Sequence, residues 1–104
     1  MNPKFRRDDD LSVFNATRIQ GAVADTEVKD SPGAIHGILI GTTGASSSMI
    51  HLYDGAVSGT AFAEIQGDVA DPCFIGPLDV LCESSIHVKT VDSGGAMEVT
   101  VLWR

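Results

Sequence analysis

The chain has 104 residues, of which 43% are hydrophobic and 20% are charged. This length suits one domain with one modest core, and the composition lies far from that of disordered chains. The 7 basic and 14 acidic residues give a net charge of −7. Because phosphate backbones and anionic lipids are bound by clustered Lys and Arg, we expect neither nucleic acid nor a membrane as a partner.

The chain also lacks the apolar segments that would direct it to a membrane. No apolar run approaches the roughly 20 residues that a membrane-spanning helix needs. The first eight residues contain three basic side chains and no apolar stretch of the secretory type. We therefore expect the protein to be made in a cytoplasm.

Residues 1–17 are predicted to form an N-terminal arm. Arg6 and Arg7 are followed directly by three aspartates, and the segment sustains neither the period of 2 of a strand nor the period of 3.6 of a helix. A frayed terminus is the usual fate of such segments. The two phenylalanines of the arm, Phe5 and Phe14, favour a tether instead, because both would gain from burial against a partner. We expect the arm to be mobile alone and to become ordered on a neighbouring molecule.

From residue 18 onward, short alternating apolar segments are separated by turns rich in Gly, Ser and Asp. Turn signals spaced roughly 8–12 residues apart are typical of β-sandwiches and barrels. No segment of ten residues carries a helical stripe. The predicted fold is an all-β antiparallel sandwich of jelly-roll-like form over residues 18–104. Its seven predicted strands are 18–24, 34–41, 49–53, 60–66, 74–81, 86–91 and 97–103.

Some of these strands carry more specific expectations. The segment 34–41 has apolar residues on both faces, which predicts a strand covered on both sides. The polar turn that follows it predicts a hairpin with 49–53. Pro77 makes the fifth strand an edge or bulged strand. The cleanest alternation is in the last strand, where the residues expected to face the core are Met97, Val99, Val101 and Trp103.

Residues for covalent catalysis are present but form no catalytic pattern. Three consecutive serines at 46–48 supply hydroxyls, and the histidines supply bases, yet no strained Gly-x-Ser-x-Gly turn joins them. Polar turns and solvent-facing strand positions account for the same residues, including His36, His51 and His87. We therefore expect no enzyme activity and no cofactor.

Metal-binding residues are equally scattered. The spacing of His51 and Asp54 is unconvincing for zinc, although several copies of a histidine around a symmetry axis would suit it chemically. The Asp54-Gly55 tip is not part of the alternating Asp run that binds calcium. We expect no metal site.

Cys73 and Cys82 are the only cysteines. They are nine positions apart and either face each other across a loop or stay unpaired in the core. A reducing cytoplasm favours free thiols.

Three short motifs lie between residues 32 and 104. The first is an apolar strand that passes through a glycine, at 32–40. The second is a Leu-Tyr-Asp strand at 52–54 with Ser-Gly-Thr at 58–60, and the third is a closing strand at 98–104 that ends in Trp and Arg. Together they resemble a pattern of small structural proteins of tailed-phage virions. The chain departs from this pattern at 82–85, where Cys-Glu-Ser-Ser replaces a Gly-rich turn.

The resemblance implies a β-sandwich or jelly roll that decorates, or cements, the phage head. Such a subunit is commonly a homotrimer, binds the major capsid protein on the virion surface, and is made in the cytoplasm of a host bacterium. The residues expected to contact the capsid are those of the arm, Phe5, Arg6, Arg7 and Phe14. The alternative is a fibre subunit or a carbohydrate-binding module with Trp103 and Tyr53 in an exposed cleft.

A small domain gains stability by packing exposed apolar residues against copies of itself. Three apolar residues fall on the strand faces opposite the predicted core. We therefore expect the contacts between subunits at Leu81, Val91 and Leu102.

Overall fold

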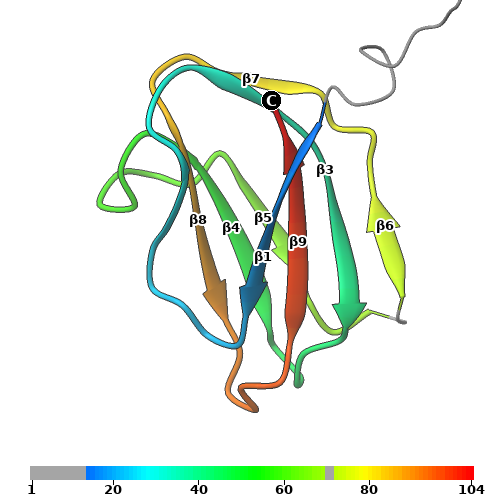
Figure 1. Cartoon of the computed structure of the whole chain (residues 1–104). Helices are drawn as coiled ribbons and strands as arrows, with labels where there is room; N and C mark the ends of the chain where they lie inside the picture. Colours follow the sequence, from blue (N-terminus) through cyan, green and yellow to red (C-terminus); the bar gives the residue numbers. More distant parts are fainter. Residues whose placement is uncertain (1–13, 70–71) are drawn as a thin grey trace, which may run out of the picture.

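The computed structural model describes residues 14–69 and 72–104, which form nine strands and no helix. Figure 1 shows the strands stacked as two layers. In chain order the strands are β1 (Asn15–Gln20), β2 (Thr26–Lys29), β3 (Gly33–Thr42), β4 (Met49–Asp54), β5 (Ala63–Gln66), β6 (Cys73–Ile75), β7 (Val80–Cys82), β8 (Ile86–Val91) and β9 (Glu98–Trp103).

All strand pairs in the two sheets are antiparallel. The five-stranded sheet, sheet A, has the order β1-β9-β3-β6, and β7 also pairs with β3; the four-stranded sheet, sheet B, has the order β2-β8-β4-β5. The pairing is nested, because the first strand pairs with the last, the second with the second last, and β4 with β5. The prediction of an all-β antiparallel sandwich is therefore confirmed.

The core fills the space between the two sheets. Alternate residues of each strand point inward, and their side chains bury β-branched and aliphatic groups that suit a pleated surface. In β9 the prediction for the inward face is confirmed, since Met97, Val99 and Val101 are buried and Trp103 packs against the core. The remaining fully buried core residues include Ile35, Ile38, Ile40, Ile50, Leu52, Ile86 and Val88.

The first strand, predicted at 18–24, is β1 at Asn15–Gln20, so it both starts and ends earlier than predicted. It begins at Asn15, three residues inside the predicted arm, because residues 15–17 pair with the end of β9. It stops at Gln20, where Gly21 has a φ of 74° and turns the chain from sheet A toward sheet B. The buried Thr90 holds this crossing segment, since its hydroxyl donates to the Gly21 carbonyl at 2.7 Å and accepts from the Val23 amide at 2.8 Å.

Two further boundaries differ from the predicted strands. The short strand β2 lies in a segment that carries no alternation long enough to predict it. The predicted strand 74–81 is divided into β6 and β7, which pair with opposite halves of the same edge of β3. Pro77 lies between them at the edge of sheet A, so the edge position is confirmed, whereas the single strand predicted across Pro77 is wrong.

The predicted hairpin between 34–41 and 49–53 is wrong. β3 lies in sheet A and β4 in sheet B, so the connection between them crosses from one layer to the other. Its polar residues fit this role, because Gly44 donates from its amide to the Gly67 carbonyl and Gly67 donates to the Ser48 carbonyl, both at 2.9 Å. The partner that β4 has in a hairpin is β5.

A bulge in β3 overturns the prediction that this strand is covered on both sides. The register with β9 shifts between Ile35 and Gly37, so His36 is an extra residue. The shift brings Ile35 onto the same inward face as Ile38 and Ile40. The outward face is left with Leu39, which is 39% exposed.

Candidate functional site

The outer side of sheet A carries a cluster of exposed apolar side chains. Cross-strand partners share a face, so Leu39 lies beside Phe74 and Ala34 lies beside Leu81 on the side opposite the buried Ile35. Phe74 is 45% and Leu81 66% exposed. We call this cluster the apolar face, and its residues are Phe14, His36, Leu39, Phe74, Leu81 and Leu102.

His36 stands at the centre of the apolar face because the bulge turns it outward. Its ring stacks on Phe14 with centroids 4.0 Å apart, and the Phe74 ring centroid lies at 6.1 Å. Its Nδ1 is 2.7 Å from a carboxylate oxygen of Asp79. The histidine therefore joins the N-terminal end of the described chain to the segment between β6 and β7.

The position of Phe74 depends on a glycine beneath it. A Cβ atom on Gly37 would lie 2.5 Å from Cε1 of the Phe74 ring, which is closer than real Cβ atoms approach. The ring therefore rests on the β3 backbone, where any side chain would displace it. This close approach is a structural reason for glycine in the middle of a strand.

Charges border the apolar face and are almost absent within it. The Arg104 guanidinium lies 5.3 Å from the Phe14 ring centroid, at one end of the sheet. Toward the other end of β1 and β9, Arg18 and Glu98 form an ion pair at 2.8 Å. Asp79, beside His36, is the carboxylate that reaches the apolar face.

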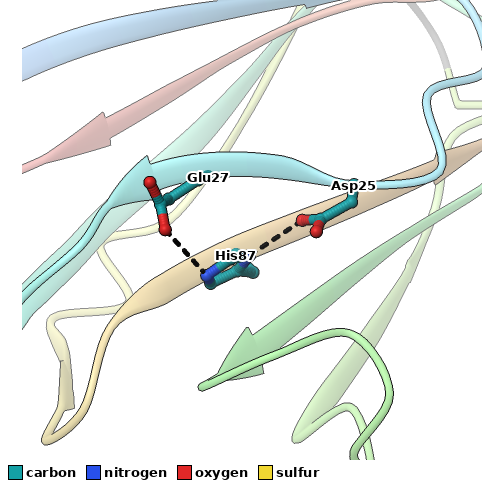
Figure 2. A network of polar contacts seen from close by, with 3 residues as sticks. All are labelled: Asp25, Glu27 and His87. Carbon is teal, nitrogen blue, oxygen red and sulfur yellow. Dashed lines mark hydrogen bonds and ion pairs between the residues drawn. The ribbon is translucent and has the colours of Figure 1, made fainter.

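The outer side of sheet B has a different chemistry. His87 lies between two carboxylates, with Nδ1 2.8 Å from Asp25 and Nε2 3.5 Å from Glu27 (Figure 2). His51 lies 3.6 Å from Glu64, and its ring stacks beside Tyr53. We call this surface the histidine face, and its residues are Asp25, Glu27, His51, Glu64, His87 and Lys89.

A buried carboxylate joins the two layers at one end of the sandwich. Asp92 is 4% exposed and follows β8 in the turn to β9. Its oxygens accept hydrogen bonds at 2.8–3.2 Å from the amides of Ala45, Gly94, Ala96 and Met97 and from the Ser48 hydroxyl. The amides of Ala45 and Met97 are the main reason that its pKa falls from 3.8 to about 2. Asp92 is therefore an ionised hydrogen-bond acceptor with a structural role, whereas a catalytic proton donor would need a higher pKa.

A second carboxylate organises the opposite loops. Asp54 accepts from the amides of Glu83 and Ser84, both at 2.9 Å, and these bonds lower its pKa. Nearby, burial and then the Asp54 charge raise the pKa of the Cys82 thiol to about 11. A thiol held protonated in this way is a poor nucleophile.

Both cysteines are free, as predicted. Cys73 pairs with Ile40 and Cys82 with Gly33, so they lie at opposite ends of the same strand. At about 3.3 Å per residue, the seven positions between those partners correspond to roughly 23 Å, which no disulfide spans.

Metal ligands and membrane-spanning helices were both expected to be absent from this chain. Within 14–69 and 72–104, no group of three or more His, Cys, Asp or Glu side chains is arranged to hold a metal ion. In the same part of the chain, no helix has the length and apolarity needed to cross a bilayer.

The residues predicted to make contacts are distributed over three places. Phe5, Arg6 and Arg7 lie outside the described residues, whereas Phe14 belongs to the apolar face. Leu81 and Leu102 lie on the same face, on strands that flank β3. Val91 is 38% exposed but lies on the outer side of sheet B, next to Met49. The three predicted subunit contacts therefore do not form one surface.

Sequence reasoning missed His36, Phe74 and Asp92. The first two follow from the bulge, which no alternation pattern in β3 marks. A signal for Asp92 was present, because an Asp directly before Ser-Gly-Gly is typical of a side chain that binds turn amides.

A scan against protein-family models, a search of curated proteins and a search of solved structures found no match to this chain.

Proposed function

We propose that this protein is a non-enzymatic structural subunit of a tailed-phage virion, a head decoration or cement protein that binds the major capsid protein. The apolar face is the observation that carries the proposal. Four of the six large hydrophobic side chains exposed in the described residues gather there, namely Phe14, Leu39, Phe74 and Leu81. Exposed apolar clusters with a charged border are typical of surfaces that bind other proteins.

The strand order supports the same class. β6 and β7 occupy one strand position, because both pair with the same edge of β3, and this gives eight positions in two nested sheets. We infer that this order is a jelly roll, an architecture used by viral capsid and lectin domains. Fold alone does not choose between these two uses.

The start of the described chain favours the capsid. Phe14 stacks on His36 within the apolar face, and 13 residues precede it in the sequence. These residues include Phe5, Arg6 and Arg7, the predicted capsid contacts. We infer that the arm and the apolar face bind the same lattice. Once one of them is bound, the effective concentration of the other is high, which strengthens each weak contact.

The two aromatic residues of the carbohydrate alternative are buried or held by contacts within the chain. Tyr53 is 6% exposed. The Trp103 indole donates to the Thr17 hydroxyl at 2.8 Å, and the Lys29 amine lies 5.8 Å from its ring. These contacts weigh against a sugar-stacking role for the two rings, and among the alternatives they favour a fibre subunit.

Co-sedimentation tests the proposal with heads assembled from the major capsid protein encoded in the same genome. We expect the full chain to sediment with the heads and Phe74→Ser to bind at least about tenfold more weakly, because a buried phenylalanine contributes about 1.5–3 kcal/mol. Phe62→Ser is the matched control, since Phe62 is 43% and Phe74 45% exposed. Equal loss in both variants, or no binding of the full chain, contradicts a capsid-binding apolar face.

A further inference from the structure

The four edges of the two sheets are not equally protected. A sheet edge with free backbone groups pairs with other strands unless it is short, bulged or interrupted. β5 and β2 have four residues each, and β2 is irregular between Glu27 and Lys29. The outer edge of β3 is covered by β6 and β7, which have three residues each and are separated by a segment containing Pro77.

β1 is the exception. Its six residues are in unbroken register with β9, and they include neither a proline nor a bulge. Within the described residues, no strand lies on its other side. Figure 1 shows β1 beside β9 as a straight strand in the front layer.

The hydrogen bonds fix which groups of β1 are free. The Gly21 amide donates to the Met97 carbonyl at 2.7 Å, directly after the paired residues Gln20 and Glu98. In an antiparallel pair, alternate residues bond to the partner and the residues between them point away. The residues of β1 at odd positions therefore bond to β9. The backbone groups that point away from β9 belong to Ala16, Arg18 and Gln20, whose side chains are also exposed.

We infer that this edge pairs with β1 of a second copy in an antiparallel, two-fold arrangement. Directly paired residues point to the same face of a sheet. An axis between two residues would pair neighbours that point to opposite faces, so the two-fold axis must pass through a residue. An axis at Arg18 would set two like charges opposite each other, which is destabilising. An axis at Thr17 sets Thr17 beside its own copy and Arg18 beside Ala16 of the second copy. The charges and the pleat therefore favour the axis at Thr17.

The paired subunits would bind a capsid lattice at two places, an inference that rests on the proposed function. Strands that pair in this way keep the outer sides of both A sheets on the same side of the joined sheet. The two apolar faces then point in one direction and engage a repeating lattice at two places. A dimer that binds at two sites is held far more firmly than either site holds one subunit. This stoichiometry replaces the trimer implied by the resemblance.

Three substitutions of Ala16 test the pairing by sedimentation velocity on the full chain. We expect the natural chain to be a dimer and Ala16→Pro to be a folded monomer, because the lost amide points away from β9 and proline is tolerated there. Ala16→Lys faces Arg18 of the second copy, whereas Ala16→Glu pairs with it. We expect the dimer of the lysine variant to dissociate about tenfold more readily than that of the glutamate variant.

The controls separate the edge from other causes. Circular dichroism and the thermal midpoint show whether each variant folds. If the proline variant does not fold, the comparison of the lysine and glutamate variants tests the pairing. Deletion of residues 2–13 should leave the dimer intact. A natural chain that stays monomeric up to about 100 µM, a trimer, or equal dissociation of the lysine and glutamate variants overturns the pairing.

Capsid binding is scored separately. A folded dimer that does not sediment with heads retains the β1 pairing and contradicts the proposed function. A natural chain that is monomeric and sediments with heads contradicts the β1 pairing and retains the proposed function.

Discussion

The outer sides of the two sheets differ in chemistry although both are built from the same alternation. On sheet A, the residues that point away from the core include Leu39, Phe74 and Leu81, and the single histidine there stacks on a phenylalanine. On sheet B, the outward rows of β4 and β8 hold His51 and His87, each beside carboxylates. A solvated sheet normally has polar residues on its outer side. Sheet B follows this rule at His51 and His87, with the exposed Val91 as an exception, and sheet A departs from it more widely.

The difference supports sheet A as the binding side of the proposed function. An outer row of ion pairs is already satisfied by groups of the same chain, and surface pairs of this kind contribute little to stability. An outer row of apolar side chains has no comparable partner within the described residues and gains free energy only by burial. We therefore propose sheet A as the recognition side and sheet B as the solvated side.

The largest expected effect comes from the turn that joins the two sheets, because unfolding there would abolish both outer faces. In Asp92→Asn, one oxygen becomes an amide donor that faces either Ala45 and Gly94 or Ala96 and Met97. Buried amides without an acceptor are costly. We expect the thermal midpoint to fall on the order of 10 °C, measured by circular dichroism. A fall below about 2 °C would contradict the structural role of this carboxylate.

The pH dependence of stability sharpens the same point. The pKa of Asp92 is lowered from 3.8 to about 2 in the folded chain, so its contribution is complete above pH 4 and is lost as the pH falls through 2. We expect the urea midpoint of the natural chain to drop between pH 4 and pH 2. Asp92→Asn should drop less over that range, because it has no proton to bind there. Parallel curves for the two proteins would show that another carboxyl group is responsible.

The next prediction concerns how the Phe74 ring packs on the β3 backbone beneath the apolar face. In Gly37→Ala, the new methyl group meets the Phe74 ring, and overpacking of this kind costs about 1–3 kcal/mol in the free energy of unfolding. Gly41→Ala is the matched control in the same strand, since its Cβ would meet no atom within 4 Å. Urea unfolding of both variants measures the difference. Equal stabilities would mean that Phe74 does not rest on Gly37.

The sequence predicts these two faces unequally. The all-β class, the inward row of β9 and the edge position signalled by Pro77 follow from alternation and proline geometry, and the free thiols follow from the expected reducing cytoplasm. The hairpin prediction failed because a polar turn looks the same whether its strands share a sheet or not. Phe14, Leu81 and Leu102 were predicted as contact residues, but their meeting in one apolar face was not, because it depends on the extra residue His36, which reverses the pleat after Ile35. A one-residue shift of this kind changes every later side chain and leaves no mark in composition.

The arm shows the same limit in another way. Its predicted end at residue 17 followed the charge pattern, whereas the strand begins at Asn15 through its pairing with Trp103, at the far end of the chain. Partners so distant in sequence cannot be identified from local periodicity. A truncation that tests the arm should therefore remove residues 2–13 and leave β1 intact. We expect such a chain to fold with an unchanged thermal midpoint and to bind heads more weakly than the full chain, by co-sedimentation.

The smallest expected effect lies on sheet B and provides the strictest test of the comparison. Asp25→Asn removes a charge 2.8 Å from His87 but keeps the shape of the side chain, and Asp25 is 45% exposed. An exposed pair contributes about 0–1 kcal/mol, so unfolding should change by no more than that, and binding to heads should not change. Asp79→Asn makes the matched change beside His36, at 2.7 Å, on the other sheet. If sheet A is the binding side, only Asp79→Asn alters co-sedimentation with heads; an effect of Asp25→Asn on binding would place the recognition surface on the histidine face.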